Sequence, residues 1–393
     1  MTSAPTDVFG YASALTAGER GKLDELRGYL DAEVRPHVAG WWERAECPVH
    51  VREGLAALHL DDDPAVLGED GRPRPLYVGF RGFELARCDL SIAMLYGGQA
   101  NMFRSVIREG GSPEQVAAWD APVAAFETTG CFALTEPDHG SDVARGMATR
   151  AVRTGDTWRI RGRKRWIGNA AISDLIAVVA ADADSGGTHV FLVPRDAEGV
   201  ELTEITGKIA VRIVRNADIV LDDVEVPESS RLQRVSSPRD IARIFASLRP
   251  DVAWFAAGMQ AGAYEVTLRY AREREQFGRP IAGFQLVQDK LARMLGNATA
   301  SLAMAVGLTG SGATASGDAA ERNAALTKAW VADALRETVA LGRGVVGGEG
   351  IRVASDVARF FADAEAVFTY EGTREVNQLI VGRAVTGLSA FVR

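Results

Sequence analysis

A single carboxylate between an aromatic residue and a glycine is the feature of this sequence best suited to chemistry. It is Glu371, in the run Tyr370-Glu371-Gly372-Thr373. The residues that follow, Thr373-Arg374-Glu375, have the pattern of a helix N-terminus, where free backbone N–H groups can face a ligand. A carboxylate held in an apolar cleft has its pKa raised and can act as a general base. An exposed loop glutamate is the simpler interpretation of these four residues alone, so the rest of the chain must decide.

Composition and charge limit the classes of partner. The chain has 393 residues, of which 47% are hydrophobic, enough for a large core in two or three domains. The net charge of −8 argues against nucleic acid or an anionic membrane as the main partner. Cys47, Cys88 and Cys131 show neither disulfide nor metal-ligand spacing. Because no secretory leader and no uninterrupted membrane-spanning apolar run are evident, we expect a cytoplasmic protein without membrane insertion.

Hydrophobic spacing predicts a chain that is helical, then β, then helical, which is an α+β fold. Apolar residues recur at helical spacing from about residue 20 to 128. Short β-rich runs separated by Gly, Pro and Asp follow up to about residue 235. Helical spacing returns after Pro238, and Pro250 is expected to interrupt or restart the first of these helices. The predicted domains are 1–129, 130–236 and 237–393.

Four motifs stand out, in the segments 131–142, 164–169, 274–285 and 370–387. They read CFALTEPDHGSD, KRWIGN, REQFGRPIAGFQ and YEGTREVNQLIVGRAVTG. Together and in this order they resemble the acyl-CoA dehydrogenase family of flavoproteins, over roughly residue 20 to the end. The resemblance implies a helical N-terminal domain, a middle β-barrel or β-sandwich-like domain and a C-terminal four-helix bundle. It also implies FAD, an acyl-CoA substrate in fatty acid or amino acid catabolism, a homotetramer built as a dimer of dimers, and an acceptor such as an electron-transfer flavoprotein.

The first motif is a strand that runs into a loop rich in hydrogen-bond donors. Backbone N–H groups and hydroxyls suit the carbonyls of a flavin ring and a nearby thioester or phosphate. An ordinary turn is the simpler alternative. The resemblance assigns Phe132, Leu134, Thr135 and Ser141 to the flavin cradle, with Ser141 also near the substrate.

In the second motif the resemblance assigns Trp166, Ile167 and Gly168 to the flavin. The Trp166 ring would pack against it and exclude water, although any single tryptophan can equally be a core residue. Gly168 stands where the family usually has a hydroxyl that bonds the reactive flavin nitrogen. That side-chain contact is therefore absent, which leaves the flavin potential and its reoxidation open to change.

In the third motif Arg274, Phe277 and Gln285 match positions that reach the flavin of a neighbouring subunit. An arginine suits the pyrophosphate through bidentate hydrogen bonds, and a solvated helix end is the alternative. The run Gly342-Arg-Gly-Val-Val-Gly347 formally matches the dinucleotide fingerprint G-x-G-x-x-G. We reject that interpretation because the run follows a helical pattern and not a strand.

The same glycine-rich run matches the family's turn between two C-terminal helices, which helps to hold the partner's flavin. Gly344 and Gly348 are assigned to it, but Gly344 stands where glutamine is common and Glu349 where asparagine is common. Thr373 and Glu375 complete the residues that the resemblance assigns to FAD.

Arg249 and Gly372 match positions near the acyl-CoA, with a helix-surface cation as the alternative for Arg249. In two branches of the family the base lies just before this arginine, where the present chain has Leu248, which cannot take a proton. The base therefore falls to Glu371. It would remove the pro-R α-proton as the β-hydrogen leaves as hydride to the flavin N5. The Glu371 N–H and a ribityl hydroxyl would polarise the thioester carbonyl.

The C-terminal motif most resembles the glutaryl-CoA dehydrogenase branch. That branch binds the distal carboxylate of its substrate with an arginine, and alignment puts Ala93 at that position. Because a buried carboxylate without a cation is costly, glutaryl-CoA is not expected to be the preferred substrate. Arg87 or Arg104 would substitute only if the helix were rotated.

Two other classes of function stay open. One is a dehydrogenase of a carrier-protein-bound acyl group or a flavin oxidase, and the change at Gly168 is the reason to consider the oxidase. The other is a non-catalytic acyl-CoA-binding descendant. The sequence leaves undetermined the acyl chain, the electron acceptor, the pathway, and the effect of Gly168, Gly344 and Glu349 on flavin binding.

Overall fold

A computed structural model describes residues 5–311 and 317–389, and their contacts divide the chain into two compact units. We call the first the helical unit; it comprises Met1–Ala93, Ile209–Ile213 and Arg249–Arg393. The second, the sheet unit, comprises Met94–Lys208 and Val214–Leu248. The helical unit thus contains both the first and the last helices of the chain.

The first long helix starts at a side-chain cap and buries one apolar face. Thr16 and Glu19 form a capping box at the start of the first long helix, and Leu23 and Leu26 on its inner face are buried. The helical spacing expected from residue 20 onward is therefore confirmed. The helices are α1 (Ala17–Tyr29), α2 (Val38–Arg44), α3 (Val49–Ala56), α4 (Pro75–Cys88) and α5 (Leu90–Gly97), with a 3-10 turn at Tyr11–Ala14 and a π-helical turn at Leu30–Val34.

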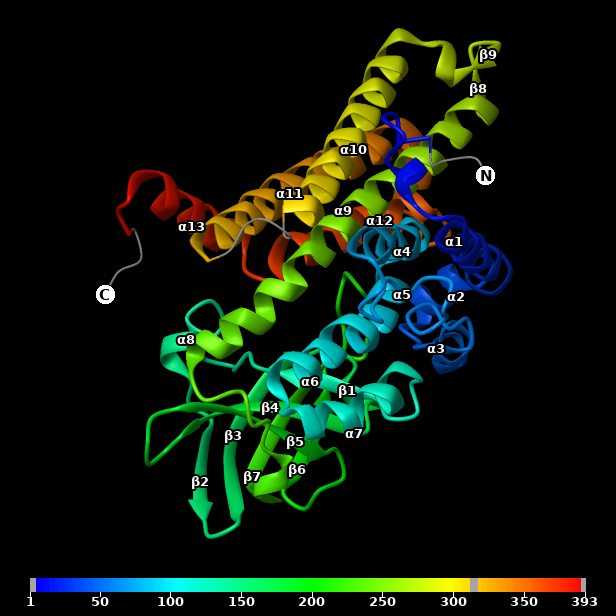
Figure 1. Ribbon diagram of the computed structural model, residues 1–393. Coiled ribbons are helices and arrows are strands. Elements are labelled where there is room, and N and C mark those ends of the chain that lie inside the picture. The colour runs from blue at the N-terminus through cyan, green and yellow to red at the C-terminus, as the bar shows by residue number, and fades with distance from the viewer. Residues whose placement is uncertain (1–4, 312–316, 390–393) are drawn as a thin grey trace. The chain divides into compact units, whose positions relative to one another are not determined.

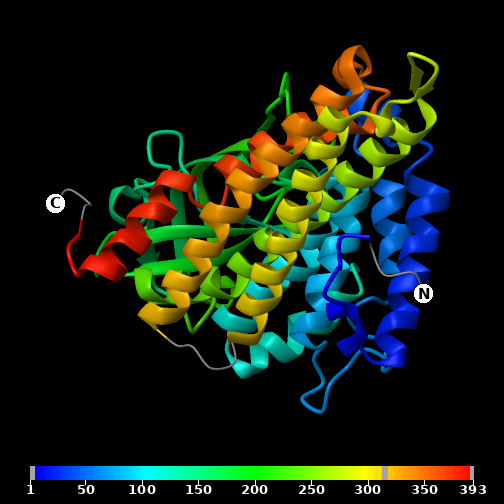
Figure 2. The same ribbon diagram turned by 90° about the horizontal axis from the view of Figure 1, so that it is seen from above.

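The C-terminal helices lie side by side in Figures 1 and 2, with α10 packed along α11. A two-stranded hairpin connects the end of α9 to the start of α10 and projects from these two helices in Figure 1. The elements are α9 (Pro238–Glu273), β8 (Glu275–Gln276), β9 (Arg279–Pro280), α10 (Gln285–Ser311), α11 (Asp318–Val346), α12 (Asp356–Thr369) and α13 (Arg374–Thr386), with 3-10 turns at Ile281–Gly283 and Gly347–Ile351.

Pro250 does not interrupt α9, so that expectation was wrong. A proline removes one helical hydrogen bond and crowds the preceding turn, which usually kinks or ends a helix. Here apolar side chains on both sides of it, Leu248 and Val252, are buried. One turn later Trp254 packs directly on Gly79 of α4, where a Cβ would collide with the indole. Burial along both halves of the helix outweighs the single lost bond.

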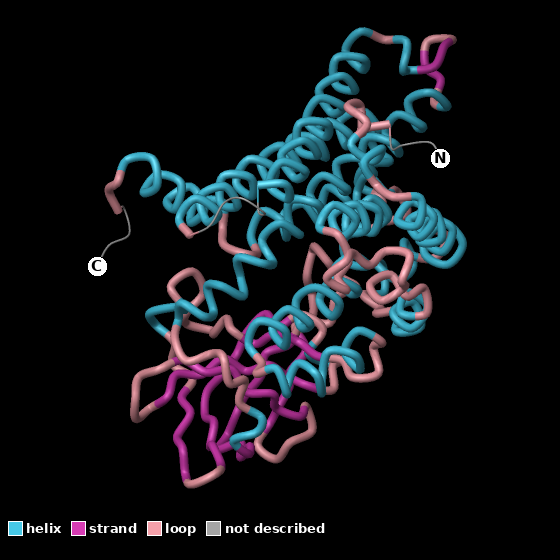
Figure 3. The backbone as a smooth tube through the Cα atoms, viewed as in Figure 1, coloured by secondary structure: helices cyan, strands magenta, loops and turns pink. Residues whose placement is uncertain are grey.

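The sheet unit contains a seven-stranded mixed sheet in the order β1-β4-β2-β3-β7-β6, with β5 paired to β4. Figure 3 shows these strands grouped together in magenta, and the β8–β9 pair is a second, two-stranded sheet. The strands are β1 (Gly130–Ala133), β2 (Arg150–Thr154), β3 (Thr157–Ile167), β4 (Leu175–Asp182), β5 (Thr188–Pro194), β6 (Val200–Glu204) and β7 (Ala217–Pro227). The helical elements are α6 (Arg104–Gly110), α7 (Pro113–Ala124) and α8 (Val143–Gly146), a π-helical turn at Gly98–Phe103, and 3-10 turns at Ala170–Ile172 and Glu228–Ser230.

Two apolar layers cover the faces of the central strands. On one face Ile176 and Val178 of β4 pack with Trp158 and Ile219, so the sheet curls back on itself. On the other, Phe132 of β1 and neighbouring strand residues pack against Phe103, Val106 and Ile107. Strands covered on both faces read as continuous apolar runs, as β4 and β5 do. In chain order, helical regions precede and follow this curled sheet, which is the expected α+β fold.

One stretch of the described chain, Gln285–Gly310 in α10, is long and apolar enough by composition to cross a bilayer. In this structure it packs along α11 and against α4. Of its most apolar window, 39% is buried inside the protein.

Candidate functional site

Two of the sequence motifs meet in the sheet unit. Phe132 and Leu134 are buried at the end of β1, and Thr135 follows them, half-buried. The backbone N–H of Arg165 donates to the Thr135 carbonyl oxygen at 2.8 Å, so the loop after β1 runs beside the end of β3. Residues about thirty positions apart in the sequence thereby form one surface.

Trp166 stands at the edge of that surface with 52% of its side chain exposed and a positive φ of 63°. Its carbonyl oxygen accepts a hydrogen bond from Asn216 Nδ2 at 3.3 Å, and Ile167 next to it is buried. A Cβ at Gly168 would find its nearest neighbours at 3.8 and 4.0 Å, which is ordinary contact. Packing therefore does not require glycine at this position.

A buried lysine fixes the loop after β1, and sequence reasoning missed its role. Lys164 Nζ donates to the Leu134 carbonyl oxygen at 3.0 Å and to Glu136 Oε1 at 2.9 Å. The side chain of Lys164 is 0% exposed and that of Glu136 2% exposed. Burial lowers the pKa of Lys164 to about 8, against the opposing effect of the Glu136 carboxylate. Thr135 is thus held between two fixed neighbours, while Ser141 further along the loop is exposed.

Glu371 lies in the short connection between α12 and α13 of the helical unit. Its φ is 55°, a left-handed backbone conformation that residues other than glycine rarely adopt. Its Oε2 atom is buried, as is the hydroxyl of Tyr370. Burial and the nearby Glu371 carboxylate raise the pKa of the Tyr370 phenol. The predicted helix start is confirmed: Thr373 is the N-cap of α13, and its Oγ1 accepts from the Val376 N–H at 3.3 Å.

A second buried lysine holds this connection and was also missed from the sequence. Lys328 of α11 is 1% exposed, and its Nζ donates to the carbonyl oxygens of Phe368 at 3.2 Å and Gly372 at 2.7 Å. Burial lowers its pKa to about 8, and the carboxylates of Glu371 and Glu375 act in the opposite direction. Glu375 itself is exposed.

The third motif forms the exposed β8–β9 hairpin. Phe277 is 94% exposed with a φ of 53°, and Arg274 and Gln285 are also exposed. Ile281, just after the hairpin, packs in one apolar cluster with Val345 at the end of α11. The structure therefore brings the hairpin motif next to the glycine-rich run.

The turn within the glycine-rich run begins later than the sequence suggested. Helix α11 extends to Val346, so Gly344 is helical and the turn starts at Gly347, where φ is 64°. Gly344 and Gly348 are exposed. Because the apolar face of α11 continues through Val345, the helix extends into the glycine-rich run. At the usual helical rise, Gly344 lies about 24 Å further along α11 than Lys328, so the hairpin end of this unit is distant from Glu371.

Three arginines named from the sequence differ in what the structure shows of them. The backbone of Arg249 belongs to α9, but its side chain lies outside the described part of the structure. Arg87 donates to Glu265 at 2.9 Å and to Glu84 at 2.7 Å. Arg104 forms a two-point ion pair with Asp120, at 2.8 and 3.0 Å. Both arginines that could replace the missing one at Ala93 are therefore already paired with carboxylates.

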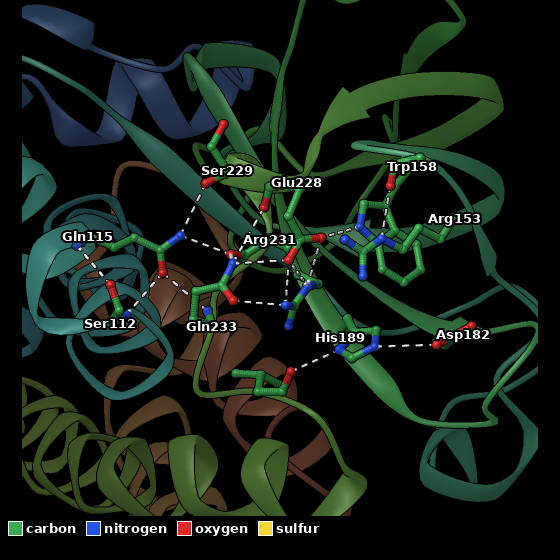
Figure 4. A network of polar contacts seen from close by, with 12 residues as sticks. Ser112, Gln115, Arg153, Trp158, Asp182, His189, Glu228, Ser229, Arg231 and Gln233 are labelled. Atoms are coloured by element: carbon green, nitrogen blue, oxygen red, sulfur yellow. Dashed lines mark hydrogen bonds and ion pairs between the residues drawn. The ribbon is translucent and has the colours of Figure 1, made fainter.

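A separate polar cluster on the sheet unit is structural (Figure 4). The Trp158 indole donates to Glu228 Oε2 at 2.5 Å, and Arg231 donates to Glu228 Oε1 at 2.5 Å. His189 Nδ1 lies 2.9 Å from the Val235 carbonyl oxygen, which can only accept, so Nδ1 carries a proton. These bonds join the segment after β7 to the sheet, and they are made between protein groups.

The comparisons with known proteins agree with the motifs. Three family models match successive parts of the chain: the acyl-CoA dehydrogenase N-terminal domain over residues 16–127, the middle domain over 131–224 and the C-terminal domain over 239–386. The 3-(aryl)acrylate reductase of Clostridium sporogenes is 33% identical over 90% of this chain and 95% of that protein.

This chain belongs to the acyl-CoA dehydrogenase family.

Two further similarities bear on this family member. The caffeyl-CoA reductase–Etf complex subunit CarC of Acetobacterium woodii is 31% identical over 69% of this chain and 72% of that protein. The structure of a Mycobacterium smegmatis glutaryl-CoA dehydrogenase in complex with FADH2 superposes with a TM-score of 0.90, at 31% identity and over 100% of both chains. The fold, the oxidoreductase class and the use of FAD by the family are thus established, and the resemblance to the glutaryl-CoA branch extends to the structure.

The residues around Thr135 fit a flavin. The surface combines apolar side chains, Phe132 and Leu134, with a half-exposed hydroxyl and an exposed indole at Trp166. A flavin ring needs such a pairing of apolar contact with donors to its carbonyls. Because residue 168 is glycine, this position adds no side-chain donor to the surface.

Proposed function

We propose that this chain catalyses the FAD-dependent α,β-dehydrogenation of an acyl-CoA, with Glu371 as the base that removes the α-proton. The observation that carries the proposal is the conformation of Glu371: a carboxylate with a buried oxygen, held at a φ of 55° between two helices. Backbone strain of this kind is retained where a side chain must point in one direction. Family membership supplies the reaction class.

FAD, when bound, accepts the β-hydrogen as hydride. The chain's own contribution is to place and shield the reacting groups. Glu371 takes the α-proton on its carboxylate, and its backbone N–H polarises the thioester carbonyl. Phe132, Leu134, Thr135 and Trp166 form the surface for the flavin ring in the sheet unit. Ser141, Arg249 and Gly372 are the proposed contacts to the acyl-CoA.

We propose an acyl group without a distal carboxylate. Ala93 is 0% exposed and offers no cation. Arg87 and Arg104 are held by Glu84, Glu265 and Asp120, so freeing either would break an ion pair in a poorly solvated place. The framework thus resembles the glutaryl-CoA branch while its substrate differs.

The quaternary structure and the location of the enzyme are part of the same proposal. The exposed Phe277 and Arg274 on the hairpin support a homotetramer in which this hairpin contacts the flavin of a neighbouring subunit. An electron-transfer flavoprotein, of the kind named with the Acetobacterium woodii relative, is the proposed acceptor, in the cytoplasm. Sedimentation of the FAD-loaded protein tests the tetramer, and a Phe277→Ser variant should lose both assembly and flavin.

An anaerobic titration with a panel of acyl-CoAs, followed at the flavin absorption bands, tests the proposed reaction. The panel comprises butyryl-, isovaleryl-, octanoyl-, 3-phenylpropionyl- and glutaryl-CoA. We expect one or more of the first four to bleach the flavin and glutaryl-CoA to be ineffective. Preferential bleaching by glutaryl-CoA would overturn the argument from Ala93, and a flavin that no member bleaches would overturn the acyl-CoA assignment.

A flavin oxidase is the second candidate, and Gly168 favours it. A glycine at this position leaves the flavin without a side-chain hydroxyl. The neighbouring atoms leave room for a Cβ, so packing does not require glycine there. Release of hydrogen peroxide during aerobic turnover would support the oxidase, whereas electrons passing only to an electron-transfer flavoprotein would exclude it.

A further inference from the structure

The backbone on either side of Glu371 is held by two buried side chains, those of Lys328 and Asn377. Glu371 and Gly372 both have positive φ, 55° and 80°. Such a pair needs neighbours that hold it, because the glutamate would otherwise relax to an ordinary conformation. Before it, α12 ends at Thr369, and after it α13 begins at Arg374. The connection is therefore short, and its carbonyl groups show what holds it.

Lys328 bridges the two sides of the connection. Its Nζ donates to the Phe368 carbonyl oxygen at 3.2 Å and to the Gly372 carbonyl oxygen at 2.7 Å. Phe368 is in the last turn of α12, where carbonyl oxygens have no helical partner and attract a cation. Since Lys328 is 1% exposed, water does not readily replace its donors.

Asn377 holds the exit of the same connection. Its Nδ2 donates to the carbonyl oxygens of Gly372 and Thr373, each at 3.0 Å, and the residue is 2% exposed. A Cβ at Gly372 would lie 3.1 Å from this Nδ2, so the amide closes tightly over the glycine. Lys328 and Asn377 meet on the Gly372 carbonyl oxygen.

We propose that Lys328 is a positioning residue for proton abstraction: its ammonium, together with Asn377, clamps the carbonyl groups before and after Glu371 and so fixes the direction of the Glu371 carboxylate. The clamp rests on the proposed role of Glu371 as base. It assigns a function in the reaction to a buried lysine of α11 that lies outside the four sequence motifs.

Electrostatics adds to this geometry. The charged groups that act on Lys328 are the carboxylates of Glu371 and Glu375, and both favour its ammonium form against the effect of burial. A cation near Glu371 in turn favours the ionised carboxylate, which is the form that accepts a proton.

Lys328→Met tests the clamp, because methionine is an unbranched side chain only one atom shorter than lysine and has no donors. Thr338→Val is the matched control: Thr338 is buried on the same helix, and its Oγ1 donates to the Ala334 carbonyl oxygen at 2.8 Å. Both are compared with wild type as FAD-loaded protein. Amide hydrogen exchange is measured by mass spectrometry on peptides covering residues 368–376. Flavin reduction is measured with butyryl-, octanoyl- and 3-phenylpropionyl-CoA, each with and without α-deuterium.

In Lys328→Met we expect at least tenfold faster exchange in these peptides and at least tenfold slower flavin reduction. The α-deuterium isotope effect should rise because proton transfer from the substrate to a misplaced base is slower, and Lys328→Arg should recover part of the rate. Thr338→Val should leave exchange and isotope effect unchanged. Unchanged exchange in Lys328→Met, or faster exchange with a reduction rate within twofold of wild type, would overturn the proposal.

Glu371→Gln separates this proposal from the function on which it rests. The variant keeps every carbonyl of the clamp, so its exchange should match wild type while flavin reduction is lost. Flavin reduction that survives in Glu371→Gln would refute the base. A wild-type flavin that no panel member reduces would refute the acyl-CoA dehydrogenation, and hydrogen exchange alone would then decide the clamp.

Discussion

Lys164 and Glu136 form an ion pair almost fully removed from solvent, with Nζ 2.9 Å from Oε1. The Glu136 carboxylate also accepts from the backbone N–H groups of Ala148 at 2.6 Å and Thr149 at 3.0 Å. These bonds fasten the loop after β1 to the start of β2 and to β3. The hydroxyl of Thr135 is therefore placed by a rigid support in the sheet unit.

Removing one partner of this pair should be costly. In Lys164→Met the Glu136 charge stays buried without its cation, which typically destabilises a protein by about 3–5 kcal/mol. Urea unfolding measures that loss, and the FAD content after gel filtration should fall with it. The double variant Lys164→Met/Glu136→Leu should recover much of the stability.

An exposed ion pair on the same strand provides the control. Arg159 and Glu225 lie 3.4 Å apart with more than half of each side chain exposed. Arg159→Met should therefore cost less than about 1 kcal/mol and leave FAD bound. Equal losses in Arg159→Met and Lys164→Met would contradict the importance of the buried pair.

The acid stability of the sheet unit should depend on Glu228. Hydrogen bonds from Arg231 and the Trp158 indole, which outweigh burial, lower the pKa of Glu228 from 4.5 to about 2. The native state thus binds fewer protons than the unfolded state between these values. The stabilisation is complete above pH 4.5 and disappears as the pH falls towards 2, with an upper limit of about 3 kcal/mol.

Glu228→Gln should accordingly lower the free energy of unfolding by a constant amount above pH 5 and by progressively less below it. Urea unfolding followed by tryptophan fluorescence at several pH values measures the difference. The exposed Glu225→Gln serves as control and should leave the pH dependence unchanged. A Glu228→Gln difference that stays the same down to pH 2.5 would contradict the assignment.

A hydroxyl at position 168 should be tolerated and should alter the flavin. Because the nearest atoms to a Cβ there are Asn216 Nδ2 at 3.8 Å and Val214 Cγ1 at 4.0 Å, Gly168→Ser is expected to change stability by less than about 1 kcal/mol. Reoxidation of the reduced flavin by oxygen should slow severalfold. Stopped-flow oxidation of wild type and Gly168→Ser measures this, and equal rates would show that position 168 does not control the flavin.

Local patterns in the sequence predicted the elements that carry the site. Thr373 marked a helix start that the structure confirms, since its side chain caps α13. Pro250 was misjudged because its local effect is overridden by packing of Trp254 on Gly79, which are distant in the sequence. Helix propensity is a weak guide wherever tertiary contacts compensate.

The supports of the site could not be predicted in the same way. Lysines are almost always exposed, so neither Lys164 nor Lys328 gave any local sign of burial. Each binds carbonyl groups about thirty to forty positions away in the sequence, at Leu134 and at Phe368 and Gly372. The pairing of Arg87 with Glu265 is equally remote. The motifs thus supplied the proposed reacting groups, while only the folded chain showed which side chains hold the backbone around them.

The central claim is that Glu371 removes the α-proton of an acyl-CoA. Its most direct test is rapid anaerobic mixing of wild type and Glu371→Gln with the acyl-CoA that bleaches the wild-type flavin, followed at the flavin absorption bands. We predict that Glu371→Gln retains FAD and that its flavin is reduced at least a thousandfold more slowly. Reduction of the flavin in Glu371→Gln within tenfold of the wild-type rate would contradict the assignment of Glu371 as the base.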